Sequence, residues 1–254
     1  MLGPGSAWRR IDVVTATGST NADLIGRAGA GEDIGGAILL AEDQTAGRGR
    51  NGRTWSAVPG AQISMSVGVS TAGLPAAAWG WVPLATGIAV VAAIADVTGV
   101  QAGLKWPNDV LSRPDGHKLA GILAEVATPA SAIVVGIGVN VSLGSDELPE
   151  PTATSLALLG ARQLDRTAIA AAILRRLQEQ FDALRAAGGA DDAIIAQYTA
   201  KSLTIGTRVR AMLPGDRQVV GDALAIDGQG RLRIQTEQDE VVVSAGDIVH
   251  LRPV

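Results

Sequence analysis

The stretch GRGRNGRTW, residues 47–55, decides between fold classes that the rest of the chain leaves open. Its three glycines have the G-x-G-x-x-G spacing of dinucleotide-binding loops, in which the first glycine follows a strand and the last opens a helix. Here residues 43–46 separate the first glycine from the preceding apolar run, and Pro59 and Gly60 lead into a period-2 segment instead of a helix. The glycine spacing therefore does not indicate a Rossmann fold.

Two other nucleotide-binding loops are excluded by the sequence. The chain contains no G-K-S or G-K-T sequence, so it has no P-loop. A kinase-type glycine loop does lie between strands, but the H-R-D and D-F-G segments that complete a kinase site are absent from this sequence. The stretch must therefore be understood from its own charges.

Three arginines, Arg48, Arg50 and Arg53, lie among these glycines. Guanidinium groups this close repel one another, and glycines hold a backbone weakly, so the segment alone is expected to be mobile. Because a phosphate or carboxylate accepts paired N–H bonds from arginine, we expect the loop to become ordered over an anionic ligand. The alternatives are a flexible solvated turn and an RNA-binding Arg-Gly tract, and an aromatic content of 3% disfavours the second.

The composition is that of a folded globular protein. The 254 residues are 47% hydrophobic and 18% charged, which suits one large domain or a large and a small one. A net charge of −4 disfavours a chain that coats nucleic acid, so any anion site must be local. Without cysteine the chain forms no disulfide and no Cys-rich zinc cluster, and two histidines, His117 and His250, are too few for an all-histidine metal cage.

No secretory signal and no membrane span are expected. Residues 1–14 lack an apolar run after their charges, which predicts a cytoplasmic protein. Residues 82–100 form the most apolar stretch, but Pro83, Thr86 and Asp96 interrupt it. We interpret this stretch as a buried helix.

The apolar pattern predicts an irregular alternation of strands and helices. Residues 17–29 predict a cap followed by a short helix, with Thr20 and Asp23 spaced as in a capping box. Residues 62–69 alternate apolar with small or polar side chains, which predicts a half-buried strand. The other predicted elements are strands over 11–14, 35–42, 103–110 (broken by Pro107), 118–127 and 131–141, and helices ending near Gly99 and covering 165–187 and 194–198. The pattern favours an α+β fold with a mixed sheet over a doubly wound one.

From residue 203 the sequence pattern changes from long helical segments to short strands and turns. Short alternating strands are separated by the turns Pro-Gly-Asp, Asp-Gly-Gln-Gly and Ala-Gly-Asp, a pattern typical of a small all-β barrel. We predict a domain boundary near residue 202, with one domain over 1–202 and a second over 203–254.

Four segments together resemble one known family. TGSTN (17–21), DQTAGRGRNGRTW (43–55), KWPNDV (105–110) and KLAGILAE (118–125) stand in the order and approximate spacing found in biotin protein ligases. The resemblance extends from about residue 11 to the C-terminus. It implies a catalytic domain similar to class II aminoacyl-tRNA synthetases, followed by a small SH3-like barrel.

The resemblance also implies an activity. The family activates biotin with ATP to biotinyl-5'-AMP, with Mg²⁺, and transfers biotin to one lysine of a biotin carboxyl carrier protein or domain. Because Ser19 lies near the start, we expect a form without the N-terminal DNA-binding domain that some members carry. The oligomeric state, the acceptor carboxylase and the Mg²⁺ ligands are left open.

Carried over residue by residue, the family pattern assigns three overlapping groups of site residues. Implied catalytic residues are Lys118, Arg50 and Asp109; implied biotin-binding residues are Ser19, Thr20, Asn21, Gln44, Arg48, Gly49, Arg50, Lys118 and Gly121; implied ATP- or adenylate-binding residues are Arg48, Arg50, Arg53, Trp55, Lys118 and Asn140. A fixed ammonium such as Lys118 suits this chemistry, because a carboxylate must approach a phosphate and the cation reduces their repulsion.

Each of these residues also has an ordinary structural interpretation. Lys118 could be a solvated lysine after a turn, Asp109 part of a turn pair with Asn108, and Trp55 a core residue. Ser19 and Thr20 could serve only as a helix cap, and glycines in strands can mark bulges. It is the ordered set of motifs that favours the site.

Three other functions remain as alternatives. A lipoate protein ligase shares the superfamily fold and the acyl-adenylate chemistry. A nucleic-acid-binding protein could use the Gly/Arg loop, although the net charge disfavours it. A biotin-sensing adaptor would bind biotin without turnover.

Overall fold

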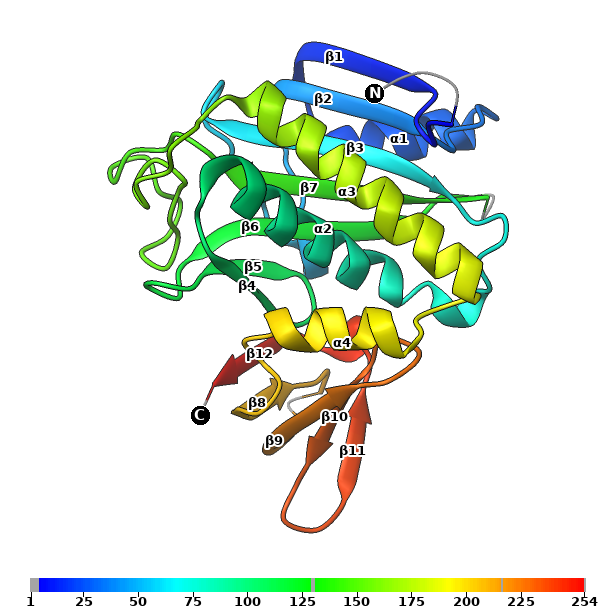
Figure 1. Ribbon diagram of the computed structural model, residues 1–254, viewed down its shortest axis with the longest axis vertical. Helices are drawn as coiled ribbons and strands as arrows, with labels where there is room; N and C mark the ends of the chain where they lie inside the picture. The colour runs from blue at the N-terminus through cyan, green and yellow to red at the C-terminus, as the bar shows by residue number, and fades with distance from the viewer. Residues whose placement is uncertain (1–4, 129–130, 216, 254) are drawn as a thin grey trace.

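Two β-sheets organise the computed structural model, which describes residues 5–128, 131–215 and 217–253. The larger sheet has seven strands in the order β1-β2-β3-β7-β6-β5-β4, and the smaller has five in the order β11-β10-β9-β8-β12 (Figure 1). In the larger sheet β1 runs parallel to β2 and all other neighbours are antiparallel. The mixed sheet predicted from the irregular alternation is confirmed.

The strands of the larger sheet are β1 (Arg10–Thr17), β2 (Ala37–Gln44), β3 (Gln62–Ser70), β4 (Ala102–Lys105), β5 (Asp109–Ser112), β6 (Lys118–Val126) and β7 (Ala132–Asn140). Helix α1 (Thr20–Gly29) connects β1 to β2, and α2 (Trp81–Thr98) connects β3 to β4. Helices α3 (Arg166–Ala187) and α4 (Asp192–Lys201) follow the sheet, and short 3-10 turns lie at η1 (Arg50–Gly52), η2 (Ala76–Ala78) and η3 (Ala245–Asp247).

Helices cover both faces of the larger sheet. Figure 1 shows α2 and α3 on one face, with α1 behind the sheet. Successive side chains of a strand point to opposite faces, so in β2 Ile38 belongs to the core under α2 and α3, whereas Leu39 belongs to a smaller core under α1. Strands covered on both faces are commonly apolar on both, as is the run AILLA in β2.

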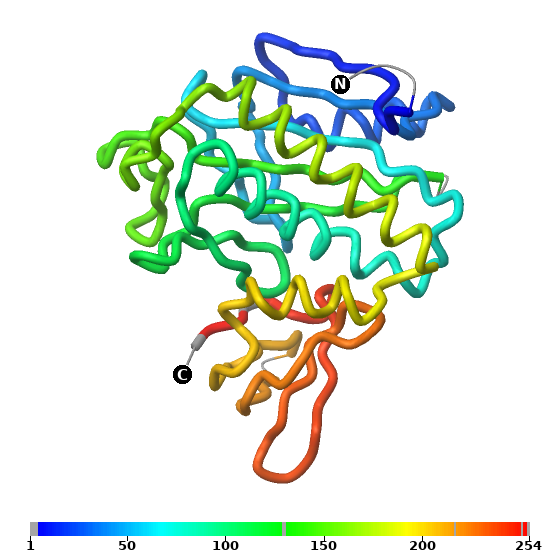
Figure 2. The backbone as a smooth tube through the Cα atoms, in the orientation of Figure 1, coloured from blue at the N-terminus to red at the C-terminus, as the bar shows by residue number. Residues whose placement is uncertain are grey.

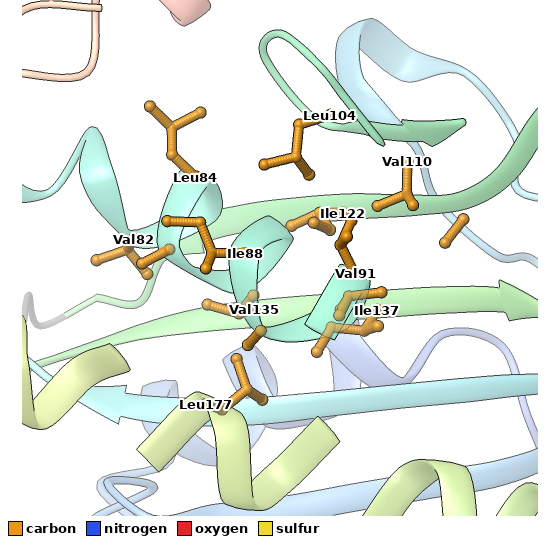
Figure 3. Packing of buried hydrophobic residues seen from close by; sticks show 14 of the residues in the cluster. Val82, Leu84, Ile88, Val91, Leu104, Val110, Ile122, Val135, Ile137 and Leu177 are labelled. Carbon is orange, nitrogen blue, oxygen red and sulfur yellow. The ribbon is translucent and has the colours of Figure 1, made fainter. Parts of the chain in front are cut away.

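Helix α2 is the central core element. It is long and apolar enough to cross a membrane by composition, but 72% of it is buried inside the structure. Figure 3 shows Val82, Ile88 and Val91 of this helix packed toward the sheet, near Ile122 and Val135. The helix ends at Gly99, whose φ of 76° is the left-handed conformation that terminates helices. The buried helix predicted for this stretch is confirmed.

Strand β3 differs from the prediction. Its apolar residues point into the core as expected, but Gln62, Ser64 and Ser66 on its other face are also buried. The reason is that α1 and the segments after β2 cover that face, and the hydroxyl of Ser66 forms hydrogen bonds there. The prediction of a half-buried strand was therefore wrong, because a polar face can be buried when it has internal hydrogen-bond partners.

The segment predicted as one broken strand is a hairpin. Strand β4 pairs antiparallel with β5, and Trp106, Pro107 and Asn108 form the turn between them. Trp106 is 1% exposed and donates from Nε1 to the carbonyl of Gly230 at 3.1 Å. Proline lacks an N–H group, so it interrupts the ladder and suits the turn position. Trp106 is thus a core residue.

The smaller sheet is entirely antiparallel and follows α4 in the chain, as the tube in Figure 2 shows. Its strands are β8 (Arg208–Met212), β9 (Gln218–Ile226), β10 (Leu232–Gln235), β11 (Glu240–Val243) and β12 (His250–Pro253). This C-terminal sheet confirms the predicted all-β unit. The boundary near residue 202 stays a prediction, and the outer ends of the two predicted domains, residues 1–4 and 254, lie outside the described residues.

Candidate active site

One cavity of about 350 Å³ contains every residue that the motifs assign to the site. Its walls come from the start of α1, the end of β2, the 47–55 stretch, and strands β5, β6 and β7. The predicted residues that line it are Ser19, Thr20, Asn21, Gln44, Arg48, Gly49, Arg50, Arg53, Trp55, Asp109, Lys118, Gly121 and Asn140. The structure therefore brings together four segments that are far apart in the sequence.

The 47–55 stretch is a small hairpin. The amide of Trp55 donates to the carbonyl of Gly47 at 2.8 Å, and the amide of Gly49 donates to the carbonyl of Arg53 at 2.7 Å. Between these bonds, Arg48 and Thr54 form an antiparallel bridge. Gly47 is required here, because a Cβ atom would collide with the backbone carbonyl of Trp55. At the tip, Asn51 adopts a φ of 55°, a left-handed conformation that asparagine tolerates better than most residues.

The tip of this hairpin is attached to the C-terminal sheet. Asn51 Nδ2 donates to the carbonyl of Ile248 at 3.0 Å, and Arg53 Nη2 donates to that of Val249 at 2.8 Å. Arg50 Nη2 donates to the carbonyls of Ala245 and Ile248, the latter at 3.2 Å. Carbonyl oxygens between β11 and β12 therefore hold the stretch in one place, whereas the sequence alone predicted a mobile loop.

Arg50 lies where its charged guanidinium is partly removed from water. Its Nη1 donates to Asn108 Oδ1 at 3.3 Å, so with the carbonyls of Ala245 and Ile248 this guanidinium donates to three neutral oxygen atoms. Burial lowers the pKa of Arg50, and the nearby Asp109 carboxylate offsets part of this effect. A desolvated guanidinium with neutral partners is stabilised by an anion that enters beside it.

Arg48, on the stem of the hairpin, faces the other way. Its Nη2 lies 2.7 Å from Glu125 Oε1, at the end of β6. The second carboxylate oxygen of Glu125 accepts from Asn21 Nδ2 at 2.9 Å. The hairpin is thus attached on one side to the C-terminal sheet and on the other to α1 through Glu125.

A buried polar network lies at the start of α1. Ser19 is the helix cap, and its hydroxyl accepts from the amide of Ala22 at 3.4 Å. The predicted capping box of Thr20 and Asp23 was wrong by one residue, because Thr20 Oγ1 instead contacts Gln44 Oε1 at 3.0 Å and Ser66 Oγ at 2.7 Å. Asp23 accepts from the hydroxyl of Thr17 at 2.6 Å, outside any capping box.

The donors available show which oxygen atoms of this network are left as acceptors. Ser66 Oγ lies 2.6 Å from Asn21 Oδ1, which can only accept, so the Ser66 proton points to Asn21. Thr20 Oγ1 has one proton for two oxygen neighbours, Ser66 Oγ and Gln44 Oε1, and it accepts from neither, because the Ser66 proton is used on Asn21 and Gln44 Oε1 can only accept. The lone pairs of Thr20 Oγ1 and one lone pair of Asn21 Oδ1 are therefore left as acceptors at the cavity wall, an arrangement that suits a neutral ligand with N–H groups.

Lys118 and Asp109 form the charged part of the cavity. Lys118 Nζ lies 2.8 Å from Asp109 Oδ1, and both side chains are about three-quarters buried, with 27% and 22% exposure. The ammonium also lies 5.7 Å from the centroid of the Trp55 ring. A partly desolvated cation fixed by a carboxylate and an aromatic face is positioned to bind an anion.

The indole of Trp55 lies directly on a pair of glycines. Gly121 of β6 and Gly138 of β7 are partners in the sheet, and a Cβ atom on Gly138 would lie 2.5 Å from Trp55 Cζ2. On Gly121 it would lie 2.9 Å from Cζ3. Only glycine leaves room for the ring at these two positions. The Trp55 Nε1 atom is buried without a hydrogen-bond partner, so no hydrogen bond from the indole holds the ring here.

Asn140 has a structural task in addition to its place in the cavity wall. It is 2% exposed, accepts from Gln62 Nε2 at 2.8 Å and donates to the carbonyl of Thr154 at 2.8 Å. The amide of Lys118 donates to the carbonyl of Thr152 at 2.7 Å. The chain after β7 is thereby fixed along the start of β6, where it contributes Glu150 and Ala153 to the wall.

Comparisons with known proteins show the family to which the chain belongs. The model of the Biotin/lipoate A/B protein ligase family matches residues 25–140, and that of the biotin protein ligase C terminal domain matches residues 204–251. The biotin acetyl-CoA-carboxylase ligase of Mycobacterium tuberculosis is 52% identical over 255 residues, which cover 99% of this chain and 93% of that protein. The chain belongs to the biotin protein ligase family.

Other biotin protein ligases are similar over most of the chain. The bifunctional ligase/repressor BirA of Escherichia coli is 31% identical, and the match covers 91% of this chain and 70% of BirA. A solved biotin protein ligase from Aquifex aeolicus, in complex with biotin and ATP, has a TM-score of 0.81 at 25% identity, covering 97% of this chain and all of that one.

Several residues in or beside this cavity were missed by the motifs. Ser66 was assigned only to a strand, and Glu125 ends the quoted segment 118–125 without a role. A serine in a strand that is buried on both faces, and a carboxylate directly after an apolar run, were the available signals. Val249 carried no such signal, because only the tertiary fold brings it into the cavity wall.

Proposed function

We propose that this protein activates biotin with ATP and then transfers the biotinyl group to a lysine of a biotin carboxyl carrier protein or domain. The observation that carries the proposal is that one cavity joins neutral hydrogen-bond acceptors at Thr20 and Asn21 to a cationic end at Lys118 and Arg50. Biotin has this pattern, since its neutral ureido ring carries N–H groups and its side chain ends in a carboxylate. The 52% identity to a biotin acetyl-CoA-carboxylase ligase over 99% of the chain supports the same activity.

In the first step, a biotin carboxylate oxygen attacks the α-phosphorus of ATP. One O–P bond forms, the bond to the leaving pyrophosphate breaks, and biotinyl-5'-AMP results. Two anions must approach, so the ammonium of Lys118 is proposed to lie between carboxylate and α-phosphate and reduce their repulsion. Asp109 fixes that ammonium at 2.8 Å and is proposed to hold it in position while the ligands enter.

Arg50 is proposed to contact the phosphate from the side of the C-terminal sheet. Its guanidinium is already held by Asn108 and by the carbonyl of Ile248, so little further ordering is needed when the anion arrives. Arg48, Gly49, Arg53 and Trp55 are proposed to surround the adenylate with the rest of the hairpin.

In the second step, the amine of the acceptor lysine attacks the carbonyl carbon of the adenylate. A C–N bond forms, AMP leaves and the amine loses a proton. Withholding water from the mixed anhydride favours transfer over hydrolysis, and the hairpin over the cavity is suited to this.

Mg²⁺ is proposed to enter with ATP. Among the described residues no group of three or more His, Asp or Glu side chains is arranged to hold a metal ion, and Asp109 is paired with Lys118. Mg²⁺ prefers phosphate oxygens and water when protein ligands are few, and it supplies charge neutralisation for pyrophosphate departure. Because the reaction uses ATP and a carboxylase, we also propose that the protein works in the cytoplasm.

The activity is tested by biotin-dependent exchange of labelled pyrophosphate into ATP, with lipoate as the matched comparison. We expect exchange with biotin and little with lipoate. Mass spectrometry of a biotin carboxyl carrier domain after incubation with the protein, biotin and MgATP should then show one biotinyl addition on one lysine. Equal exchange with lipoate would overturn the assignment to biotin, and biotin binding without exchange would make the protein a sensor.

The nucleic-acid alternative is disfavoured by the contacts of the hairpin. The guanidinium groups of Arg48, Arg50 and Arg53 all contact protein oxygens, at Glu125 and between β11 and β12. A nucleic-acid-binding Arg-Gly tract would present them to phosphates along an open surface. Tight RNA or DNA binding at physiological salt without pyrophosphate exchange would reverse this conclusion.

A further inference from the structure

We propose that Glu125 is a positioning residue that joins the recognition group Asn21 to the hairpin arginine Arg48. The inference rests on the proposed function, since it concerns the same cavity. Glu125 lies near the end of β6, and its neighbours in the strand, Ala124 and Val126, are apolar. The roles assigned to the other residues do not explain a carboxylate at this position. Its two carboxylate oxygens accept hydrogen bonds from two different residues, Asn21 and Arg48.

The geometry of Glu125 leaves one oxygen for each donor. Oε1 lies 2.7 Å from Arg48 Nη2, and Oε2 lies 2.9 Å from Asn21 Nδ2. Asn21 is 3% exposed, whereas the Arg48 side chain is 48% exposed. The Glu125 side chain is 22% exposed, and it bridges the buried amide of Asn21 and the more exposed guanidinium of Arg48.

The same contact fixes which end of the Asn21 amide faces the cavity. Glu125 and the carbonyl of Leu123, at 3.2 Å, both accept from Nδ2, so Oδ1 must point toward Ser66 and the cavity. Gly136 of β7 lies beneath the amide, where a Cβ atom would be 3.0 Å from Asn21 Cγ. Glu125 thus helps to orient the acceptor that a ligand N–H group would meet.

A continuous series of hydrogen bonds follows from these contacts. It runs from Thr20 to Ser66 to Asn21 to Glu125 to Arg48, and each link is 2.6 to 2.9 Å long. A ligand that binds Thr20 and Asn21 strengthens the orientation of Asn21, which in turn orients the carboxylate that holds the hairpin. Recognition of the neutral ring and ordering of the hairpin are thereby coupled, and Glu125 is the only carboxylate in the series.

Neutral or shorter side chains cannot perform both tasks. In Glu125→Gln one end of the side chain becomes an N–H donor, which must face the N–H group of either Arg48 or Asn21. In Glu125→Asp the charge remains, but the side chain is one methylene shorter. The carboxylate can then reach one of the two donors but not both at once. We expect the apparent KM for biotin to rise roughly tenfold to a hundredfold in Glu125→Gln, less in Glu125→Asp, with kcat changed far less.

The experiment compares Glu125→Gln and Glu125→Asp with Glu240→Gln. Glu240 accepts two hydrogen bonds from Arg233 at 2.6 and 2.7 Å and is 33% exposed, so it is a similar carboxylate–arginine pair on the C-terminal sheet. Two readouts are made on the full chain: the KM for biotin against kcat in pyrophosphate exchange, and amide hydrogen exchange of residues 47–55 without ligand. We expect faster exchange in this hairpin for Glu125→Gln, and wild-type behaviour in both readouts for Glu240→Gln.

A double-mutant comparison shows whether Glu125 acts through Arg48. In an Arg48→Ala background, Glu125→Gln should raise KM by a smaller factor than it does in the wild type, because one of its two partners is already gone. Equal factors in both backgrounds, or hairpin exchange in Glu125→Gln equal to that of the wild type, would overturn the proposal. If the wild type itself shows no biotin-dependent pyrophosphate exchange, the proposed function fails, but the hydrogen-exchange result still decides whether Glu125 orders the hairpin.

Discussion

Gly138→Ala tests whether the Trp55 ring occupies the cavity floor in the free protein. The added Cβ would lie 2.5 Å from Trp55 Cζ2 and 2.8 Å from Nε1, whereas ordinary contacts begin at 3.4 Å. The indole or the strand must therefore move by about 1 Å. The backbone of Gly138 itself needs no left-handed conformation, so the whole perturbation comes from this collision.

The expected loss of stability follows from overpacking. Forcing an extra methyl group into a packed site destabilises a protein by about 1–3 kcal/mol. If the ring leaves its position instead, the contact between the Lys118 ammonium and the Trp55 ring, at 5.7 Å, is lost, and such contacts contribute roughly 0.5–1 kcal/mol. At roughly 2–4 °C per kcal/mol for a chain of this size, we expect the Tm to fall by roughly 2–12 °C.

The measurement is thermal and urea unfolding of Gly138→Ala, Trp55→Ala and the double variant. Without the indole the methyl group has space, so Gly138→Ala should cost little in the Trp55→Ala background, or stabilise the fold by reducing the freedom of the unfolded chain. Gly228→Ala is the control, because a Cβ there meets nothing within 4 Å. If Gly138→Ala destabilises both backgrounds equally, the ring does not lie on this glycine and the reasoning fails.

Three further predictions concern the hairpin, the proposed catalytic lysine and a surface ion pair. Asn51→Gly keeps the left-handed backbone but removes the hydrogen bond to the carbonyl of Ile248. Protease should then cut residues 47–55 faster, while the urea midpoint stays close to that of the wild type. Unchanged digestion would show that this hydrogen bond does not hold the tip of the hairpin. Lys118→Ala should unfold as the wild type does yet lower the rate of pyrophosphate exchange by about a hundredfold or more, and a near-normal rate would remove Lys118 from the catalytic group. The hydrogen bond from the Arg27 guanidinium holds the pKa of Asp12 below its ordinary value. The stability that this carboxylate provides is therefore present at neutral pH and is lost as the pH falls through its folded-state pKa. The urea midpoints of Asp12→Asn and the wild type should differ at pH 7 and converge in acid.

Much of the site could be predicted because its residues lie within short motifs. Ser19, Thr20 and Asn21 follow β1 directly, and Lys118 opens β6, so local sequence places them at the ends of elements. Ends of strands that are neighbours in a sheet meet at one edge, which is why four separate motifs form one cavity. The role of each residue in binding and catalysis remains a prediction that the experiments above address.

The state of the hairpin could not be predicted from its own sequence. Glycine content and three like charges favour mobility, and this holds for the isolated segment. The partners that order it, Glu125 and the carbonyl of Ile248, are 77 and 197 residues away in the chain from the side chains that they hold. No local pattern contains such contacts, because they depend on how β6 and the C-terminal sheet pack beside the hairpin.

These contacts change what the three arginines of the hairpin can do. Arg50 and Arg53 donate to neutral carbonyls, and a carbonyl binds a guanidinium more weakly than a phosphate does. An entering anion can therefore attract Arg50 without breaking an ion pair, whereas moving Arg48 requires breaking its contact with Glu125. The arrangement predicts different tasks for two arginines in the same motif: Arg50 responds to the phosphate, and Arg48 keeps the hairpin joined to the recognition group. Removing Arg50 should therefore mainly slow adenylate formation, and removing Arg48 should mainly raise the KM for biotin; the reverse pattern in pyrophosphate exchange would contradict this division.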